Sequence, residues 1–293
     1  MSNIPGLPPI SRAREFHLYS RDGNRFLDMY LSDGGALLGH RPRAVAREIS
    51  SALSRGLFAD YPSTLGARLE RLLVSGASRL GGNGREGRVF RNRERAFAAA
   101  ATFFGCNLYE LPVADGARPA LPIDPGHSSD RVAAPCRVVI FRPFAVDSAV
   151  PGDADIVLPI VPFPGDWAPA IAYFPPRNGR GSLVPESDTL SPALLGALNR
   201  AIHNLLHSAD WPGARIDSAK LKPLWTANGP YLFACCGEEQ YREVYDRFLA
   251  RRILLNPQFP GPSILPIIWS EGEQTLFFRS CEAAAKELFR GEF

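Results

Sequence analysis

The sequence predicts an α/β protein, and three observations lead to this class. Three short apolar runs, at residues 137–141, 155–161 and 169–174, are bounded by proline or glycine, as buried strands of such a sheet usually are. Helical patterns with one apolar face precede and follow these runs. The last third of the chain alternates strand and helix, which is typical of a compact α/β lobe.

The chain begins with an arm and a hairpin. Residues 1–16 are rich in proline and glycine, which predicts an extended arm whose order depends on a neighbour. Alternating apolar residues on both sides of Asp22 and Gly23 predict a β-hairpin over residues 17–31.

Helices are predicted where apolar side chains recur on one face or where small residues permit close packing. They cover residues 43–55, 63–73, 94–105, 191–207, 238–252 and 281–291. Further strands are predicted at residues 87–92, 230–236, 253–257 and 263–269. Two segments dense in proline and glycine, residues 111–135 and 174–188, are interpreted as loops.

Composition excludes several classes of function. A formal charge of +3, with arginines scattered among acids, gives no reason to expect a nucleic-acid partner. No apolar run approaches the roughly 18 to 20 residues that cross a bilayer, so no membrane partner is expected. Five cysteines without C-x-x-C spacing indicate reduced thiols and a cytoplasmic location. His203 and His207 have a spacing that metals use, but no third ligand is evident, so no metal is expected.

Lysine is scarce in this chain. Of 33 lysine and arginine residues only three are lysine, and all lie in the C-terminal quarter: Lys220, Lys222 and Lys286.

Three segments resemble a known family. Residues 18–53 contain RFLDMYLSDGGALLGHRP and are similar to the N-terminal region of the class III aminotransferases, the branch with glutamate-1-semialdehyde aminomutase and ornithine aminotransferase. There a G-x-x-Y/F-L-D strand leads to a glycine-containing turn and then to L-G-H-x-P. Residues 229–273, with PYLFACC and ILLNP, resemble the same family's small C-terminal domain. Residues 186–206 resemble its entrance to the interdomain helix, with Thr189 and Pro192 in register or nearly so.

The resemblance implies a reduced fold-type-I large domain with a small α/β C-terminal lobe. It divides the chain into residues 1–60 (N-terminal arm and part of the small lobe), 61–208 (reduced large domain) and 209–293 (C-terminal small domain). The interval from Gly105 to Thr189 is too short for the family's full large domain. The proline-rich arm and residues 31–42 (LSDGGALLGHRP) carry apolar side chains that a truncated large domain would not cover, which predicts a homodimer. The resemblance also implies assembly with a paralogous aminotransferase as an alternative, because the family builds its active sites across a dimer.

The family also implies pyridoxal phosphate as the cofactor, but the motifs that hold it are missing. Instead of the S-G-[ST]-E-A turn that cradles the cofactor phosphate at a helix N-terminus, residues 91–96 read Arg-Asn-Arg-Glu-Arg-Ala. Where a D-E-V aspartate would face the pyridine nitrogen, Arg142 follows the strand, with Asp147 farther on. After residues 153–156, proline stands where the lysine is expected. Pyridoxal phosphate needs a lysine amine for its Schiff base, and arginine cannot replace it.

Some residues still align with the family's motifs. No catalytic residue is predicted, and Lys220 and Lys222 are the fallback positions for a Schiff base. The remaining candidates for cofactor binding are Arg93, Glu94, Arg95, Thr189, Gly34 and Gly35.

Three hypotheses about function follow. The first is a non-catalytic relative of the aminotransferases, a pseudoenzyme with a binding or assembly role. The second is an active aminotransferase or aminomutase that uses an unrecognised lysine. The third is a sensor that keeps an anionic small molecule between its lobes, with Arg91, Arg93 or Arg95 as anchors.

Overall fold

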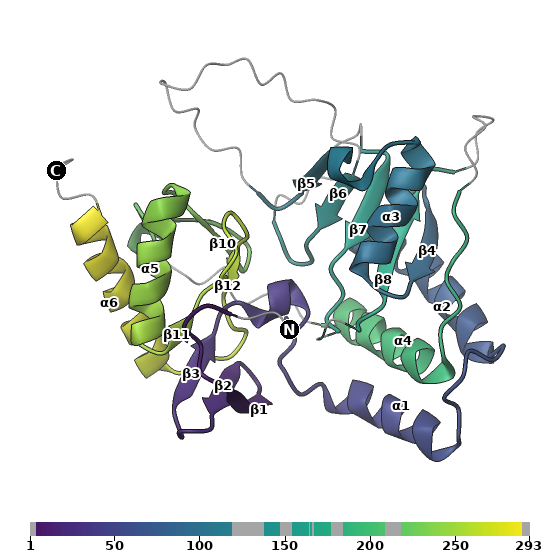
Figure 1. The fold of residues 1–293 in the computed structure, drawn as a ribbon, viewed down its shortest axis with the longest axis horizontal. Helices are drawn as coiled ribbons and strands as arrows, with labels where there is room; N and C mark the ends of the chain where they lie inside the picture. The colour runs from purple at the N-terminus through teal and green to yellow at the C-terminus, as the bar shows by residue number, and fades with distance from the viewer. Residues whose placement is uncertain are drawn as a thin grey trace. The chain divides into compact units, whose positions relative to one another are not determined.

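The computed structural model describes residues 4–118, 138–146, 154–163, 165, 167–176, 184–208 and 218–288. The chain forms two compact units (Figure 1). The terminal unit comprises Met1–Arg41, Phe144–Val146 and Asp210–Phe293, and the central unit comprises Pro42–Pro143 and Asp147–Ala209. Residues 42–60, which the sequence-based division grouped with the N-terminal arm, cluster with the central unit.

A five-stranded sheet lies in the described part of the central unit, in the order β4-β8-β7-β6-β5. Its strands are β4 (Glu86–Phe90), β5 (Val113–Asp115), β6 (Val138–Phe141), β7 (Ile156–Pro159) and β8 (Ala170–Phe174). β5, β6 and β7 are parallel, whereas β8 is antiparallel to both β7 and β4. The three predicted apolar runs are therefore confirmed as β6, β7 and β8. β5 corrects the predicted loop, because three residues among prolines and glycines carry no strand pattern of their own.

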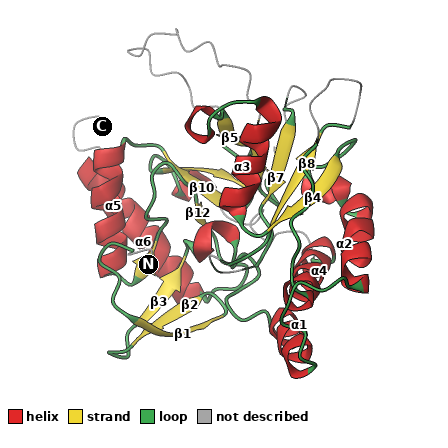
Figure 2. Ribbon diagram, turned by 45° about the vertical axis from the view of Figure 1, so that its right-hand side comes forward, coloured by secondary structure: helices red, strands yellow, loops and turns green. Residues whose placement is uncertain are grey.

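Helices cover both faces of this sheet (Figure 2). The helices of this unit are α1 (Arg43–Ser54), α2 (Thr64–Ser75), α3 (Arg93–Phe104) and α4 (Pro192–Leu206), with 3-10 turns at η2 (Ala77–Leu80) and η3 (Leu108–Glu110). Of these, α1 packs on α4. α3 packs on the face formed by Phe90, Ala172 and Phe174. On the opposite face Tyr173 donates its hydroxyl hydrogen bond to the carbonyl of Leu73 in α2, at 2.9 Å. Because both faces are covered, the strands read as apolar runs rather than alternating patterns.

Capping residues fix both ends of α3. Asn92, in an extended conformation, accepts a hydrogen bond from the amide of Arg95 through its side chain at 2.8 Å. Gly105 ends the helix with a φ of 65°, a conformation that glycine adopts without strain. The side chains that face the sheet are small, which lets the helix approach it closely: Ala96, Ala99, Ala100 and Ala101.

The terminal unit is built from both ends of the chain. Its strands are β1 (Ile10–Arg14), β2 (His17–Ser20), β3 (Arg25–Asp28), β9 (Trp225–Asn228), β10 (Tyr231–Ala234), β11 (Ile253–Leu254) and β12 (Ser263–Ile264). Its helices are α5 (Glu238–Ala250) and α6 (Glu271–Leu288), with 3-10 turns at η1 (Leu31–Gly34) and η5 (Ser218–Lys220). The sheets have the orders β1-β2-β3-β11 and β12-β10-β9. Parallel pairing of Leu27 with Ile253 joins the N-terminal hairpin to the C-terminal part.

The structure confirms the predicted hairpin as β2 and β3. The N-terminal arm finds its neighbour in α5, because Tyr245 donates its hydroxyl hydrogen bond to the carbonyl of Pro5 at 2.8 Å. β9 was not predicted. α6 begins at Glu271 rather than at Cys281, because Ser270 and Glu273 form a reciprocal cap that starts the helix earlier.

Parts of both predicted loops lie outside the described residues, namely residues 119–135 and 177–183, as does Asp147. Within the described residues, no helix combines the length and the apolar character that crossing a membrane would require.

Glu273 connects the hairpin to α6. Its Oε1 lies 2.7 Å from Nε2 of His17 and 3.1 Å from the guanidinium of Arg25. Its Oε2 accepts hydrogen bonds from the amide and the hydroxyl of Ser270, at 2.8 and 2.9 Å. Burial raises the pKa of Glu273, but the hydrogen bonds from Ser270 and His17 outweigh burial and leave the pKa below its ordinary value.

We expect Glu273→Gln to lower the free energy of unfolding by about 1 to 2 kcal/mol at pH 7. A carboxyl whose pKa is depressed in the folded state stabilises the fold above its unfolded pKa and loses this effect as the pH falls through the folded value. The difference between wild type and variant should therefore shrink below about pH 4. Urea denaturation at pH 7 and at a pH below about 4 measures this difference, with Glu271→Gln, at an exposed position, as control. An equal difference at both pH values would contradict the assignment.

Candidate functional site

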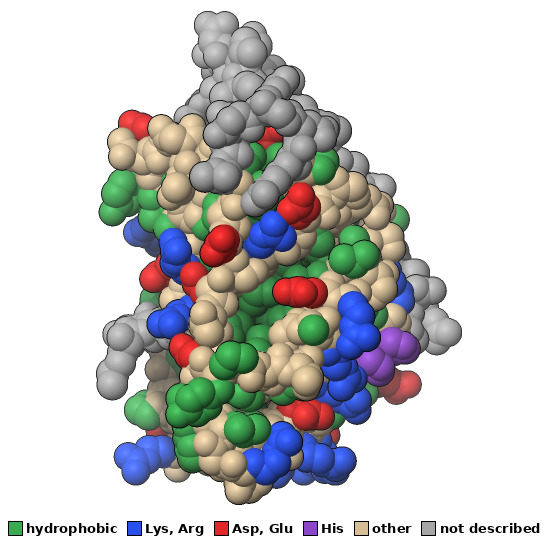
Figure 3. Space-filling model, turned by 90° about the vertical axis from the view of Figure 1, so that its right-hand side faces the viewer, with side chains coloured by type: hydrophobic (Ala, Val, Ile, Leu, Met, Phe, Trp, Pro, Cys, Tyr) green, Lys and Arg blue, Asp and Glu red, His purple; other side chains and the backbone are tan. Residues whose placement is uncertain are grey.

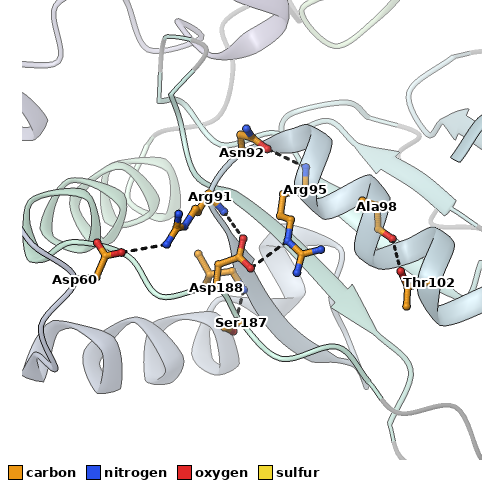
Figure 4. A network of polar contacts seen from close by, with 9 residues as sticks. Asp60, Arg91, Asn92, Arg95, Ala98, Thr102, Ser187 and Asp188 are labelled. Carbon is orange, nitrogen blue, oxygen red and sulfur yellow. Dashed lines mark hydrogen bonds and ion pairs between the residues drawn. The ribbon is translucent and has the colours of Figure 1, made fainter.

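The start of α3 is the position that the family resemblance assigns to a phosphate cradle. β4 ends at Phe90, Arg91 and Asn92 form the turn, and α3 begins at Arg93. A second segment runs beside this turn, because the amide of Asp188 donates to the carbonyl of Val89 at 2.8 Å. The amide of Val89 in turn donates to the hydroxyl of Ser187 at 3.1 Å (Figure 4).

The carboxylate of Asp188 lies at this helix start. It accepts a hydrogen bond from the amide of Arg91 at 3.0 Å and one from Nε of Arg95 at 3.3 Å. The side chain of Asp188 is only 14% exposed, whereas that of Arg95 is half exposed. The guanidinium of Arg91 points to a second carboxylate, that of Asp60, at 3.1 Å (Figure 4). The positive end of α3 and its arginines thus already face two carboxylates of the chain itself.

The structure separates the candidate cofactor ligands. Arg95 and the segment that carries Asp188 and Thr189 come together, and Thr189 itself is exposed. Arg93 places its guanidinium 5.6 Å from the ring centroid of Phe97, one helical turn along α3. Glu94 is exposed in the first turn, where its charge complements the helix dipole.

Gly34 and Gly35 belong to the terminal unit, in the turn η1 and at its end. Leu31, Ser32 and Asp33 all have φ near +50°, a left-handed run that is costly for residues other than glycine.

Asp28 holds this left-handed run in place. Its carboxylate, which is almost fully buried, accepts hydrogen bonds from the amides of Tyr30 and Leu31 at 2.8 and 3.0 Å. Its second oxygen lies 2.6 Å from Nε2 of His40. His40, the histidine of the L-G-H-x-P motif, therefore holds the carboxylate of Asp28, which in turn binds the backbone of Tyr30 and Leu31.

A buried ion pair lies at the carboxyl ends of two parallel strands. Arg142, directly after β6, has a side chain that is 3% exposed, and its Nε donates to Oδ2 of Asp115 at 2.7 Å. Asp115 ends β5, and its other oxygen accepts a hydrogen bond from the amide of Ala117 at 3.1 Å. In α/β sheets ligands bind beyond the carboxyl ends of the strands, and here an arginine and its partner lie at that edge.

All three lysines lie in the terminal unit. Lys220, Lys222 and Lys286 are exposed, and the ammonium group of Lys220 lies 5.7 Å from the ring centroid of Phe278. The central unit has no lysine in its sequence.

Among the described residues no group of three or more metal-ligating side chains occurs. The rings of His203 and His207 stack with centroids 4.0 Å apart, and Nδ1 of His207 lies 2.8 Å from the carbonyl of His203. Burial, together with the nearby His207, Arg200 and Arg68, lowers the pKa of His203. The spacing of the two histidines is explained by the ring stacking and by the contact of His207 with the last turn of α4.

Two aspartates that bind arginines in the central unit were not predicted as site residues. Asp115 and Asp188 both lie in segments interpreted as loops, and their partners are far away in the sequence. An acidic residue in a loop gives no signal of which arginine it will meet.

No protein-family model matches the chain. It is 26% identical to an uncharacterized protein of Treponema pallidum, over 92% of this chain and 92% of that protein. It is 24% identical to an uncharacterized protein of Borreliella burgdorferi, over 98% and 95%. A 66-residue stretch is 33% identical to the glutamate-1-semialdehyde 2,1-aminomutase of Saccharolobus islandicus, over 22% of this chain and 16% of that enzyme.

Solved structures show the fold. A glutamate-1-semialdehyde aminomutase from Pseudomonas aeruginosa matches with a TM-score of 0.63 at 14% identity, over 96% of this chain and 88% of that one. An N-acetylornithine aminotransferase from Stenotrophomonas maltophilia matches with a TM-score of 0.62 at 13% identity, over 98% of each chain. The chain has the fold of the class III aminotransferases. The predicted resemblance and fold class are confirmed.

We expect Asp115→Asn to lower the free energy of unfolding by about 2 kcal/mol, because it replaces the carboxylate to which Nε of the buried Arg142 donates by a neutral amide. The matched control is Asp60→Asn, which removes a carboxylate from the exposed Arg91 and should change stability by less than about 1 kcal/mol. Chemical denaturation of the two variants measures the difference. Equal effects would show that burial of Arg142 does not matter.

Proposed function

We propose that this protein is a shortened, aminotransferase-like protein that has lost pyridoxal phosphate chemistry and works by binding or by assembly. The observation that carries the proposal is the distribution of lysine. The central unit, with the sheet and α3, contains no lysine to form a Schiff base.

The side chains at the two other motif positions do not fit the cofactor either. At the end of β6 the family has an aspartate that keeps the pyridine nitrogen protonated, and here Arg142 would disfavour that proton. At the start of α3 the amide of Arg91 and the guanidinium of Arg95 already bind Asp188. Three independent departures support loss of the chemistry better than any one of them alone.

The enzyme alternative rests on Lys220 or Lys222. A lysine that forms a Schiff base is usually activated by desolvation or by a neighbouring cation. Both side chains are exposed, and both belong to the unit without the five-stranded sheet and α3. This exposure favours the non-catalytic proposal.

For the assembly role we propose a homodimer formed through the central unit. The short segment from the end of α1 to the start of α2 exposes three large hydrophobic side chains, Leu53 (40%), Phe58 (66%) and Tyr61 (62%). Figure 3 shows the face of the central unit that carries α1, α2 and α4, where hydrophobic side chains are exposed among arginines. Exposed apolar groups gathered in this way usually mark an interface.

Our first prediction here is that no stoichiometric aldimine forms with pyridoxal phosphate at neutral pH. Borohydride reduction followed by mass spectrometry tests it, and transamination should stay at background. Scattered partial labelling of the exposed lysines is expected, because free amines react weakly with any aldehyde. A stoichiometric adduct at Lys220 or Lys222, lost together with activity in the Lys→Ala variant, would restore the enzyme hypothesis.

The second prediction concerns assembly. Light scattering should give the mass of a dimer at micromolar concentration. Phe58→Asp should weaken the dimer at least ten-fold, since the new carboxylate would be buried in an apolar interface without an ionic partner. Tyr109→Asp, at a fully exposed position in η3, serves as the control. A monomeric wild-type protein would refute the homodimer.

A further inference from the structure

We propose that Asp188 is a built-in anion of the α3 N-terminus and that its carboxylate excludes phosphate groups from this position. The inference rests on the proposed function only in explaining why a phosphate-binding turn is dispensable. Inorganic phosphate tests its exclusion from the start of α3 directly, without any aldehyde chemistry.

The position of Asp188 is fixed by the backbone. Its amide donates to the carbonyl of Val89, and the amide of Val89 donates to the hydroxyl of Ser187. These two contacts lay the segment along β4, which is an edge strand of the described sheet. The carboxylate therefore does not depend on a flexible side chain alone to stay at the start of α3.

Two of the backbone donors at this helix start already have acceptors. The amide of Arg91 donates to Asp188, and the amide of Arg95 donates to the side chain of Asn92. The turn has no glycine that would let a phosphate approach its backbone closely. A phosphate would have to displace these acceptors rather than enter an open site.

Charge acts in the same direction. Asp188 and Asp60 each place a carboxylate against one of the arginines, at 3.3 and 3.1 Å. Arg91 and Arg95 are more than half exposed, so their attraction for a further anion is screened by water. An incoming phosphate at the start of α3 would meet the negative charge of Asp188, and like charges about 4 Å apart repel by roughly 1 kcal/mol in water and by more near a protein surface.

Removal of the carboxylate should convert the helix start into an anion site. In Asp188→Ala the amide of Arg91 and the guanidinium of Arg95 lose their acceptor and become free to bind a phosphate. In Asp188→Asn the charge disappears but the shape stays. We therefore expect the affinity for phosphate to rise from wild type through Asp188→Asn to Asp188→Ala.

The experiment is calorimetric titration of the full chain with inorganic phosphate at low salt. Wild type should show no saturable binding up to about 10 mM phosphate, and Asp188→Ala should bind one phosphate with a Kd on the order of 1 mM, which is at least about ten-fold tighter. Adding Arg95→Gln to Asp188→Ala should abolish this binding. Asp60→Asn is the matched control, because it frees Arg91 but leaves Asp188 in place, and it should behave like wild type.

Two results would overturn the proposal. One is saturable binding by wild type that Arg95→Gln removes, since the site would then be open. The other is a folded Asp188→Ala protein, verified by circular dichroism, that binds no phosphate. If Asp188→Ala does not fold, the isosteric Asp188→Asn carries the same test. An aldimine at a lysine of the terminal unit would refute the proposed function and leave these titrations unaffected.

Discussion

The parallel pairing of β3 with β11 is the constraint on which the rest of the structure depends. It joins residues near the two ends of the chain, with Leu27 opposite Ile253, and so makes the terminal unit from both ends. The intervening chain must then build the sheet and α3 as a separate unit. The division also separates the lysines from the five-stranded sheet in sequence, since every lysine falls in the terminal unit and none in the central one.

Internal ion pairs explain how the central unit keeps its fold where ligands would otherwise lie. A buried guanidinium needs a carboxylate, and Arg142 finds one in Asp115 on the neighbouring parallel strand. A helix start attracts negative charge, and α3 finds it in Asp188. In both places an aspartate of the chain itself accepts a hydrogen bond from the group that carries the positive charge.

Local patterns carried most of the fold and little of the site. Periodicity located α1, α2 and α5, and the apolar runs located β6, β7 and β8, because burial on a defined face leaves a regular pattern in the sequence. β5 escaped, since three residues are too few to show a period. Asp115 and Asp188 escaped for another reason: each meets its arginine only after distant segments have paired, and single-sequence patterns contain no such distances.

A fold can persist after its chemistry has gone, because the two depend on different residues. The fold here depends on many buried apolar side chains, any one of which can be exchanged for another of similar size. The chemistry of a Schiff base depends on one amine, for which no other side chain substitutes. This chain matches an aminomutase structure over 96% of its length at 14% identity, while the sequence of its central unit contains no lysine. Under the proposed function, the chain retains the fold and uses it for binding or assembly.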